Sequence, residues 1–306
     1  LLGEAQTRQL ANELFTSLQR VMALDDRTEV HPGHGAGSLC GAGIGRDPAS
    51  SIGRERQQNA LLQYRERDAF VAAVLADIPE TPSYFSRMKR VNAAGPPILG
   101  LVDGDIRVPS LKPGAAAALA ADGAVVIDLR STDAFAAGHP YGALNIAYGP
   151  KVGYWAGWVV PDGTPMILLS DDPVHARAAA VQLLRVGLDR IEGTIVGGYD
   201  AWTADGLPGA TVDRITAGQL RVMPMCIVDV RTPAEWRAGH VEGSINIPVG
   251  DILLRAHELV GDTPVATICE GGYRSSLAAS LLLQEGVSHV VNVIGGMAAC
   301  RDLERI

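Results

Sequence analysis

The sequence predicts an α/β protein in which two copies of a parallel-sheet domain follow a mainly helical segment. An internal repeat covers about two thirds of the chain. Within each copy, short β-branched runs alternate with stretches rich in Ala and Leu. Strands that alternate with helices favour a parallel sheet covered by helices on both faces. The first hundred residues carry almost no strand pattern, so helices are expected there.

Three helices are expected in the N-terminal segment, over residues 4–24, 54–76 and 82–91. A glycine-rich loop at 31–45 separates the first two helices. A segment of this size is either a small helical domain or one part of a larger domain, and its pattern alone fits both.

Matching segments define the repeat. Residues 125–147 match residues 227–248, and both carry Asp-x-Arg, Gly-His and Asn-Ile at one spacing. Residues 195–202 match residues 293–300 through a shared Gly-Gly pair. The turn-rich segment 205–209 separates the two copies. The predicted domains are 1–103, 104–210 and 211–306.

The second copy shows the expected elements most clearly. Its β-branched runs predict strands over Ile227–Val230, Val265–Ile268 and Val290–Ile294. A serine-capped helix is expected over Ser275–Glu285. These elements place the segment 269–274 between the end of a strand and the N-terminus of a helix.

The composition is that of a globular protein, with 47% hydrophobic and 20% charged residues. The net charge of −8 gives no electrostatic support to nucleic-acid or anionic-membrane binding. No apolar run approaches the ~20 residues that a membrane helix needs. The missing signal peptide says little, because the sequence begins at Leu1 rather than Met.

Four cysteines, Cys40, Cys226, Cys269 and Cys300, are far apart and form no Cys-x-x-Cys pair. Neither a disulfide framework nor a structural zinc site is therefore expected. This usage is typical of the reducing cytoplasm, and a cytoplasmic location is predicted.

The segment Cys269–Ser275 (CEGGYRS) has the pattern of a nucleophile loop. A loop between a strand end and a helix N-terminus can direct successive backbone N–H groups inward, and Gly271 and Gly272 allow the curled backbone that this requires. The helix dipole and Arg274 add positive potential, so we expect the reactive thiolate of Cys269 to be favoured. The alternative is a buried structural cysteine, which the glycine pair and the arginine disfavour.

The first copy carries the same loop without the nucleophile. Ser170 aligns with Cys269, and Asp171 and Asp172 would repel an anionic substrate. Pro173 removes one N–H from any anion nest, and His175 stands in the position of Arg274. A structural or docking role is therefore expected for this copy.

The nucleophile loop, the Asp-Val-Arg strand end at 229–231 and the segments 239–248 and 293–297 resemble a rhodanese sulfurtransferase. The resemblance implies that Cys269 carries a persulfide, stabilised by Arg274 and the loop backbone. The residues that it implies for substrate binding are Glu270, Gly271, Gly272, Tyr273, Ser275 and Arg231. The sequence departs from the family at Cys300, where the family often has Trp.

The loop length distinguishes two chemistries. Four residues separate Cys269 from Arg274, whereas related cysteine phosphatases and arsenate reductases have five between Cys and Arg. The shorter loop favours sulfur transfer over phosphate hydrolysis.

The first hundred residues, including PGHGAGSLCG around His34 and Cys40, resemble the C-terminal part of metallo-β-lactamase-fold persulfide dioxygenases. Some of these carry two rhodanese-like domains, the first without its cysteine. The fold class implied is two tandem rhodanese-like α/β domains preceded by a remnant of an αββα domain. The family's HxHxDH motif is absent and would lie before Leu1. His34 is therefore a candidate metal ligand in an incomplete site, and the alternative for His31 and His34 is a pair of surface loop histidines.

Three functions follow as alternatives. The first is a sulfurtransferase that moves sulfane sulfur from thiosulfate or a small persulfide through Cys269 to sulfite, cyanide or a thiol, as part of sulfide detoxification. The second is a fragment of an iron-dependent dioxygenase or related hydrolase, and the third is a non-catalytic scaffold. Rhodanese activity needs no cofactor, and iron or zinc is expected only with the missing N-terminal half. The expected partners are small sulfur compounds, not nucleic acid or membrane, and a homo-oligomer is left open.

Overall fold

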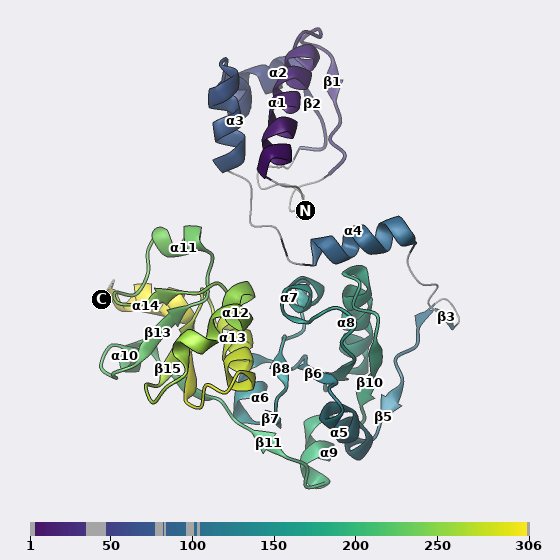
Figure 1. Cartoon of the computed structure of the whole chain (residues 1–306), viewed down its shortest axis with the longest axis vertical. Coiled ribbons are helices and arrows are strands. Elements are labelled where there is room, and N and C mark those ends of the chain that lie inside the picture. Colours follow the sequence, from purple (N-terminus) through teal and green to yellow (C-terminus); the bar gives the residue numbers. More distant parts are fainter. Residues whose placement is uncertain are drawn as a thin grey trace. The chain divides into compact units, whose positions relative to one another are not determined.

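The computed structural model describes residues 4–34, 47–76, 82, 84–95, 101–102 and 105–304. The chain divides into two compact units, Leu1–Phe85 and Ser86–Ile306, and both copies of the repeat lie in the second unit (Figure 1). The predicted domain boundaries at 103/104 and 210/211 stay predictions.

The first unit is built on two packed helices, α1 (Glu4–Val21) and α3 (Arg67–Ala76). Phe15 of α1 meets Phe70 of α3 with ring centroids 5.3 Å apart. Its remaining elements are β1 (Glu29–Val30), β2 (Ser50–Ser51), α2 (Ile52–Gln58) and η1 (Ala60–Gln63). The mainly helical character expected here is confirmed.

The expectation of a single helix over 54–76 is wrong, because the helix ends before Asn59 and a second, 3₁₀ helix begins after it. The backbone of Asn59 is extended (φ −79°, ψ 115°), and its side chain accepts a hydrogen bond from the N–H of Leu61. Asn competes with the helix through such local bonds, so it ends α2 and caps η1.

The first repeat contains a parallel five-stranded sheet in the order β5-β10-β9-β6-β8. The strands are β5 (Ser110–Leu111), β6 (Val125–Asp128), β8 (Leu144–Asn145), β9 (Met166–Leu169) and β10 (Ile191–Ile195). The helices of this repeat are α5 (Pro113–Ala121), α6 (Thr132–Ala137), α7 (Val152–Val159), α8 (Pro173–Arg185) and α9 (Gly198–Ala204). The elements that precede it are α4 (Phe85–Ala94), β3 (Leu101–Val102) and β4 (Asp105–Ile106). All four residues of β9 are buried, as expected for a central strand covered on both faces.

The second repeat has the same topology, with its sheet in the order β12-β16-β15-β13-β14. The strands are β12 (Asp213–Ile215), β13 (Cys226–Asp229), β14 (Ile245–Asn246), β15 (Val265–Ile268) and β16 (Val290–Val293). The helices are α10 (Ala217–Leu220), α11 (Pro233–Arg237), η2 (Val249–Asp251), α12 (Ile252–Arg255), η3 (Ala256–Leu259), α13 (Tyr273–Gln284) and α14 (Gly296–Glu304). The predicted fold class is confirmed, and the three predicted strands agree to within one residue at each end.

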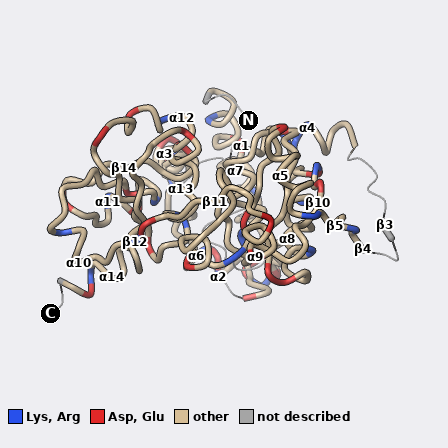
Figure 2. Tube along the Cα trace, turned by 90° about the horizontal axis from the view of Figure 1, so that it is seen from below, with Lys and Arg blue, Asp and Glu red and all other residues tan. Residues whose placement is uncertain are grey.

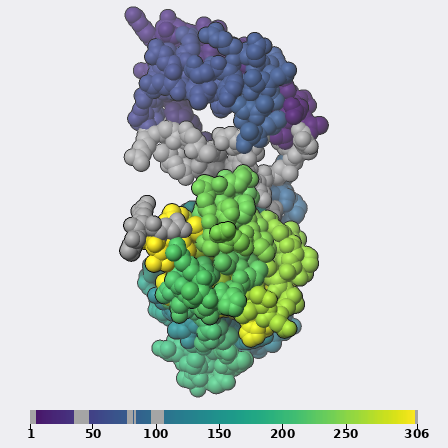
Figure 3. Space-filling view, turned by 90° about the vertical axis from the view of Figure 1, so that its left-hand side faces the viewer, coloured from purple at the N-terminus to yellow at the C-terminus, as the bar shows by residue number. Residues whose placement is uncertain are grey.

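The two repeats share one interface within the second unit. Helix α13 lies against β8 of the first repeat, and Ser276 Oγ donates a hydrogen bond to Asn145 Oδ1 at 2.6 Å. One cluster of buried apolar side chains runs through both repeats, so their cores are continuous. The space-filling view shows the second repeat, in green to yellow, as one closely packed body (Figure 3).

A short connecting strand leads from the first repeat into the second. Strand β11 (Gly209–Ala210) pairs antiparallel with β7 (His139–Pro140). Residues of both charge signs are distributed over both repeats (Figure 2). Within the described part of the chain, no helix is long and apolar enough to cross a bilayer.

Candidate active site

The fold places the nucleophile loop at the C-terminal edge of the second sheet. Strand β15, between β13 and β16, ends at Ile268, and Cys269 is the next residue. Gly272 has a left-handed backbone (φ +102°), which turns the chain directly into α13. A residue with a side chain rarely adopts this conformation, so the glycine expected to allow the curl does so.

The Cys269 thiol lies inside this loop and is 1% exposed. The N–H of Gly272 donates to its Sγ at 3.1 Å, and Ser275 Oγ lies 3.4 Å from it. The carbonyl oxygen of Cys269 accepts a hydrogen bond from the N–H of Met297 in α14 at 2.8 Å. The contacts that orient the sulfur therefore come from the loop and the start of α13, while the bond from α14 holds the loop backbone in place.

Ser275 does not cap α13, contrary to the expectation, because the cap position is Gly272 and the helix already begins at Tyr273. The Ser275 hydroxyl points inward and donates to Asn292 Oδ1 of β16 at 2.7 Å. Asn292 is buried and its role was not foreseen, since an Asn within an apolar strand gives no local signal of contact with the loop.

Arg274 is held by a carboxylate from another element. Its Nη1 and Nη2 donate to Glu235 Oε2 and Oε1, both at 2.7 Å. The Arg274 hydrogen bonds outweigh the effect of burial and lower the pKa of Glu235 to about 2. A two-point contact fixes the plane of the guanidinium as well as its position.

Glu235 also belongs to a capping box. Its backbone N–H donates to Thr232 Oγ1, and its side chain accepts from the N–H of Thr232. The sequence shows the capping box as Thr-Pro-Ala-Glu but carries no signal that Glu235 contacts the nucleophile loop. The capping box therefore holds the Glu235 carboxylate in the position in which it accepts the hydrogen bonds of Arg274.

Arg231 and Glu270 are placed in the framework of the loop. Arg231 is buried, and its guanidinium donates to Asp229 Oδ2 and to the carbonyl oxygen of Gly239, both at 2.7 Å. Glu270 forms an ion pair with Arg301 of α14 and lies 3.7 Å from Arg231. The expectation of substrate contact for these two residues stays a prediction, and the structure gives them a supporting role.

Tyr273 and Gly271 face the first repeat. Tyr273 is largely buried, which raises its pKa, and its hydroxyl donates to the carbonyl oxygen of Ala147 at 3.0 Å. Both residues border a cleft of about 660 Å³ whose other wall belongs to the first repeat. That wall includes Arg130, Tyr148, Ser170, Asp171, Asp172 and His175. Gly271 and Tyr273 of the nucleophile loop therefore face the corresponding loop of the other copy across this cleft.

The first repeat uses its loop differently. Ser170 Oγ donates to the carbonyl oxygen of Asp172 at 2.9 Å and accepts from the N–H of the same residue. The His175 ring stacks on Tyr148 with centroids 3.9 Å apart. Ser170 is thus engaged in local backbone bonds, and the loop holds two carboxylates in place of an anion cradle.

The candidate metal ligand His34 lies in the first unit. His34 is exposed, and His31 pairs with Glu29 at 3.0 Å. Within the described residues, no group of three His, Cys, Asp or Glu side chains is close enough to hold a metal ion, so these residues do not fit an iron or zinc site. Cys40 lies outside the described residues.

Gly296 provides a test of how closely α14 must approach the loop. A Cβ there would overlap the carbonyl oxygens of Cys269 and Glu270, and φ is +55°. We expect Gly296→Ala to lower the free energy of unfolding by about 3 kcal/mol, from strain and overlap together. Gly271→Ala is the control, because nothing lies within 4 Å of its Cβ position. Denaturant midpoints measure both, and equal midpoints would contradict the close approach.

Comparison with known proteins agrees with this geometry. The family model "Rhodanese-like domain" matches residues 113–205 and 211–302. A sulfurtransferase of Allochromatium vinosum is 37% identical over 73 residues, which cover 24% of this chain and 68% of that protein. The thiosulfate sulfurtransferase GlpE of Pseudomonas aeruginosa LESB58 is 33% identical over 90 residues, covering 28% and 79%. The match spans only 38% and 56% of two Bacillus subtilis relatives, YrkF and YqhL.

A solved metallo-beta-lactamase from Staphylococcus aureus is 28% identical, with a TM-score of 0.51. The match covers 60% of this chain and 49% of that one. The resemblance inferred from the sequence, of two rhodanese-like domains combined with a metallo-β-lactamase relationship, is confirmed by these matches.

Proposed function

Because the chain belongs to the rhodanese-like family, we propose that it is a sulfurtransferase whose Cys269 carries sulfane sulfur as a persulfide. The observation that supports this most is the placement of the Cys269 sulfur. It lies in a tight loop at the C-terminal edge of the sheet, where the Gly272 N–H donates to it. Open parallel sheets carry their sites at this edge.

The transfer takes place in two displacements. The Cys269 thiolate attacks the outer sulfur of thiosulfate or of a small persulfide, a new S–S bond forms, and sulfite or a thiolate leaves with the electron pair of the broken bond. A nucleophilic acceptor (sulfite, cyanide or a thiolate) then attacks the outer sulfur of the cysteine persulfide. The Cys269–sulfur bond breaks, and its electron pair returns to Cys269 as the thiolate.

The groups around the loop suit an anionic intermediate. The outer sulfur of a persulfide carries the charge, and backbone N–H groups stabilise such charge without moving. Arg274 supplies a fixed positive charge, because Glu235 holds its guanidinium. Burial acts to lower the pKa of Arg274, but the Glu235 bonds and the charges on Glu235 and Cys269 raise it overall.

Thiocyanate formation from thiosulfate and cyanide tests the proposal. We expect turnover without added metal, with the alternating-substrate kinetics of a covalent intermediate. Glutathione persulfide serves as a second donor. If neither donor supports transfer to cyanide, sulfite or a thiol, the chain is not a sulfurtransferase.

A cysteine introduced at Ser170 is expected to remain unloaded. Asp171 and Asp172 repel an anionic donor at this position, and the backbone of Asp172 already bonds Ser170 as both donor and acceptor. In a Ser170→Cys, Cys269→Ser double variant, intact-protein mass spectrometry after thiosulfate should show no added sulfur. A loaded residue 170 would show that the cysteine alone decides which repeat is active.

A further inference from the structure

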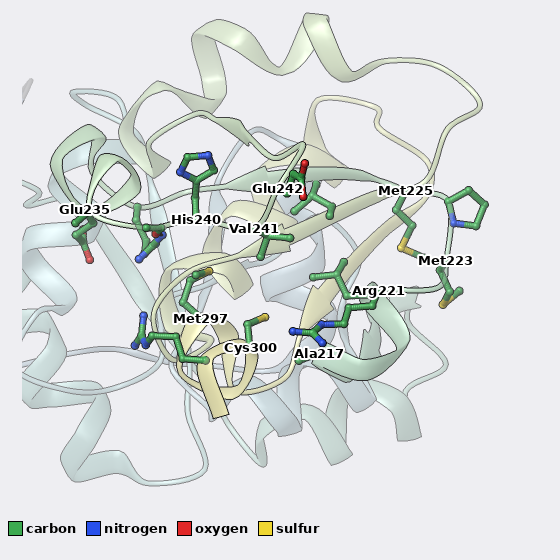
Figure 4. A pocket seen from close by; sticks show the side chains of 17 residues that line it. Ala217, Arg221, Met223, Met225, Glu235, His240, Val241, Glu242, Met297 and Cys300 are labelled. Carbon is green, nitrogen blue, oxygen red and sulfur yellow. The ribbon is translucent and has the colours of Figure 1, made fainter. Parts of the chain in front are cut away.

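The second repeat contains a cleft of about 810 Å³ on the side of the nucleophile loop that carries α10 and α14. Figure 4 shows Val241 and Glu242 along one side of it, with Met297 and Cys300 of α14 on the other. Its lining includes the apolar side chains of Leu220, Met223, Met225 and Ile227.

The first repeat has the same surface, but there it is covered. His139 and Pro140 correspond to His240 and Val241, and the strand β11 pairs along them, Ala210 with His139 and Gly209 with Pro140. The N–H of Tyr141 donates to the carbonyl oxygen of Pro208 at 3.1 Å. His139 is 2% exposed as a result, whereas His240 is exposed.

The equivalent backbone edge of the second repeat, at Val241 and Glu242, can still form hydrogen bonds with an added strand. Glu242 corresponds to Tyr141, and among the described residues its backbone N–H has no hydrogen-bond partner. The ring of His240 still stacks on Trp236, as His139 stacks on Phe135, so the local fold is the same in both repeats. The difference between the repeats is the covering strand.

In the first repeat, large aromatic side chains fill the space that corresponds to this cleft, and the second repeat has smaller side chains there. Tyr199 and Trp202 stand where the second repeat has Met297 and Cys300, and Trp202 Nε1 donates to the carbonyl oxygen of Pro208. A Cβ at Gly138 would lie 2.7 Å from the Tyr199 ring, whereas nothing lies within 4 Å of the Cβ position at the equivalent Gly239. The space occupied by aromatic rings in one repeat is therefore open in the other.

We propose that this cleft binds an extended segment of a partner protein, added as a strand along Val241 and Glu242. The segment inserts one large apolar side chain into the space that Tyr199 and Trp202 fill in the first repeat. Backbone bonds to an exposed edge with a side-chain pocket beside it are a common means of peptide recognition. This binding goes beyond the proposed function, although Arg231 and Glu235, which help to hold the nucleophile loop and Arg274, also line the cleft.

The charged residues of the cleft favour a peptide over a small anion as the occupant. Arg231 and Arg301 are paired with Glu270, and Glu235 is paired with Arg274. These charges are committed to holding the nucleophile loop. Beside these pairs, the lining offers the backbone edge at Val241 and Glu242 and several apolar side chains, which suit an extended polypeptide.

The probe is a peptide with the sequence of residues 207–212, in which Gly209 is replaced by Phe. In the first repeat a Cβ at Gly209 would lie 2.5 Å from the Tyr199 hydroxyl, so a larger residue there would have to displace Tyr199. Met297 replaces that tyrosine in the second repeat, so we expect Phe to be accommodated there. We expect the full chain to bind the Phe peptide at least about tenfold more tightly than the Gly peptide, measured by calorimetry.

Two variants separate the cleft from the rest of the surface. Cys300→Trp restores the packing of the first repeat and should weaken binding of the Phe peptide at least about tenfold. Val241→Pro is the matched control, because Pro140 pairs with the covering strand in the first repeat, and it should bind as wild type does.

Hydrogen exchange gives a readout in the wild-type chain that does not depend on the folding of either variant. The amide of Glu242 should exchange rapidly in the free chain and slow at least about tenfold with the Phe peptide. No binding of that peptide, equal binding by Cys300→Trp, or a Glu242 amide already protected in the free chain would each overturn the proposal.

Discussion

Replacing Cys269 by Ser is expected to abolish both the uptake of sulfane sulfur and all turnover with thiosulfate. The substitution changes one atom in a position that is 1% exposed, so the loop and the Gly272 N–H contact should persist. A hydroxyl at this position is a far weaker nucleophile than a thiolate and forms no persulfide. The loss therefore reports the chemistry of the sulfur rather than a change in fold.

Intact-protein mass spectrometry after treatment with thiosulfate measures this directly. Wild type should gain one sulfur atom, and cyanide should remove it. Cys226→Ser is the matched control, because Cys226 lies in β13 of the same sheet and undergoes the same change of atom. Added sulfur that persists in Cys269→Ser, for example on Cys300, would assign the nucleophile to another residue.

The sequence predicts the fold well because its signals are local and repeated. The runs Val265–Ile268 and Val290–Ile294 are rich in β-branched residues. The structure has strands there with at most one residue of difference, and every residue of these strands is buried. The same pattern occurs twice at nearly one spacing, so each copy supports the interpretation of the other. The N-terminal unit has no second copy to support its interpretation, and its sequence does not reveal that the helix ends at Asn59.

The site was predicted only where its residues are neighbours in sequence. Cys269, Gly272 and Arg274 come from one loop and are found together. Glu235 and Asn292 reach the same loop from α11 and β16, and only the folded sheet brings them there. Tertiary contacts of this kind leave no periodic signal in the sequence.

The strand β11, which covers the first repeat, shows a further limit of prediction from the sequence. The turn-rich segment 205–209 was interpreted as a boundary between copies, and in the structure its last residue also begins a strand that pairs with β7. The departure at Cys300 was visible in the sequence. Its consequence is an open cleft where Trp202 packs in the first repeat, and this is evident only in the two folded copies.

Removing the guanidinium in Arg274→Ala is expected to lower kcat/KM for thiosulfate by about 10²–10³, the range found when one fixed donor to a developing anion is lost. Arg274→Lys should recover only part of this, because an ammonium group cannot make the two-point contact with Glu235. Arg237→Ala is the control, since Arg237 is an exposed arginine at the end of α11. Steady-state rates with thiosulfate and cyanide measure the three variants.

Glu235 should act through Arg274, as a positioning residue. We expect Glu235→Gln to lower kcat/KM about tenfold, because the guanidinium loses its charged partner and its fixed orientation. Adding Glu235→Gln to Arg274→Ala should then cost little more, since both changes remove the same unit. Independent, multiplying effects of the two substitutions would show that Glu235 serves only the α11 cap.

The pH dependence gives a second readout for this pair. The pKa of Glu235 is lowered from 4.5 to about 2, because the charged form is bonded to Arg274. A lowered folded-state pKa means that the contribution of the pair is fully present above pH 4.5 and is lost only as the pH falls through about 2. The ratio of wild-type to Glu235→Gln rates should therefore stay constant between about pH 5 and 8. A ratio that falls toward 1 already near pH 5 would show that the Glu235 carboxylate is not bonded to Arg274 in the working enzyme.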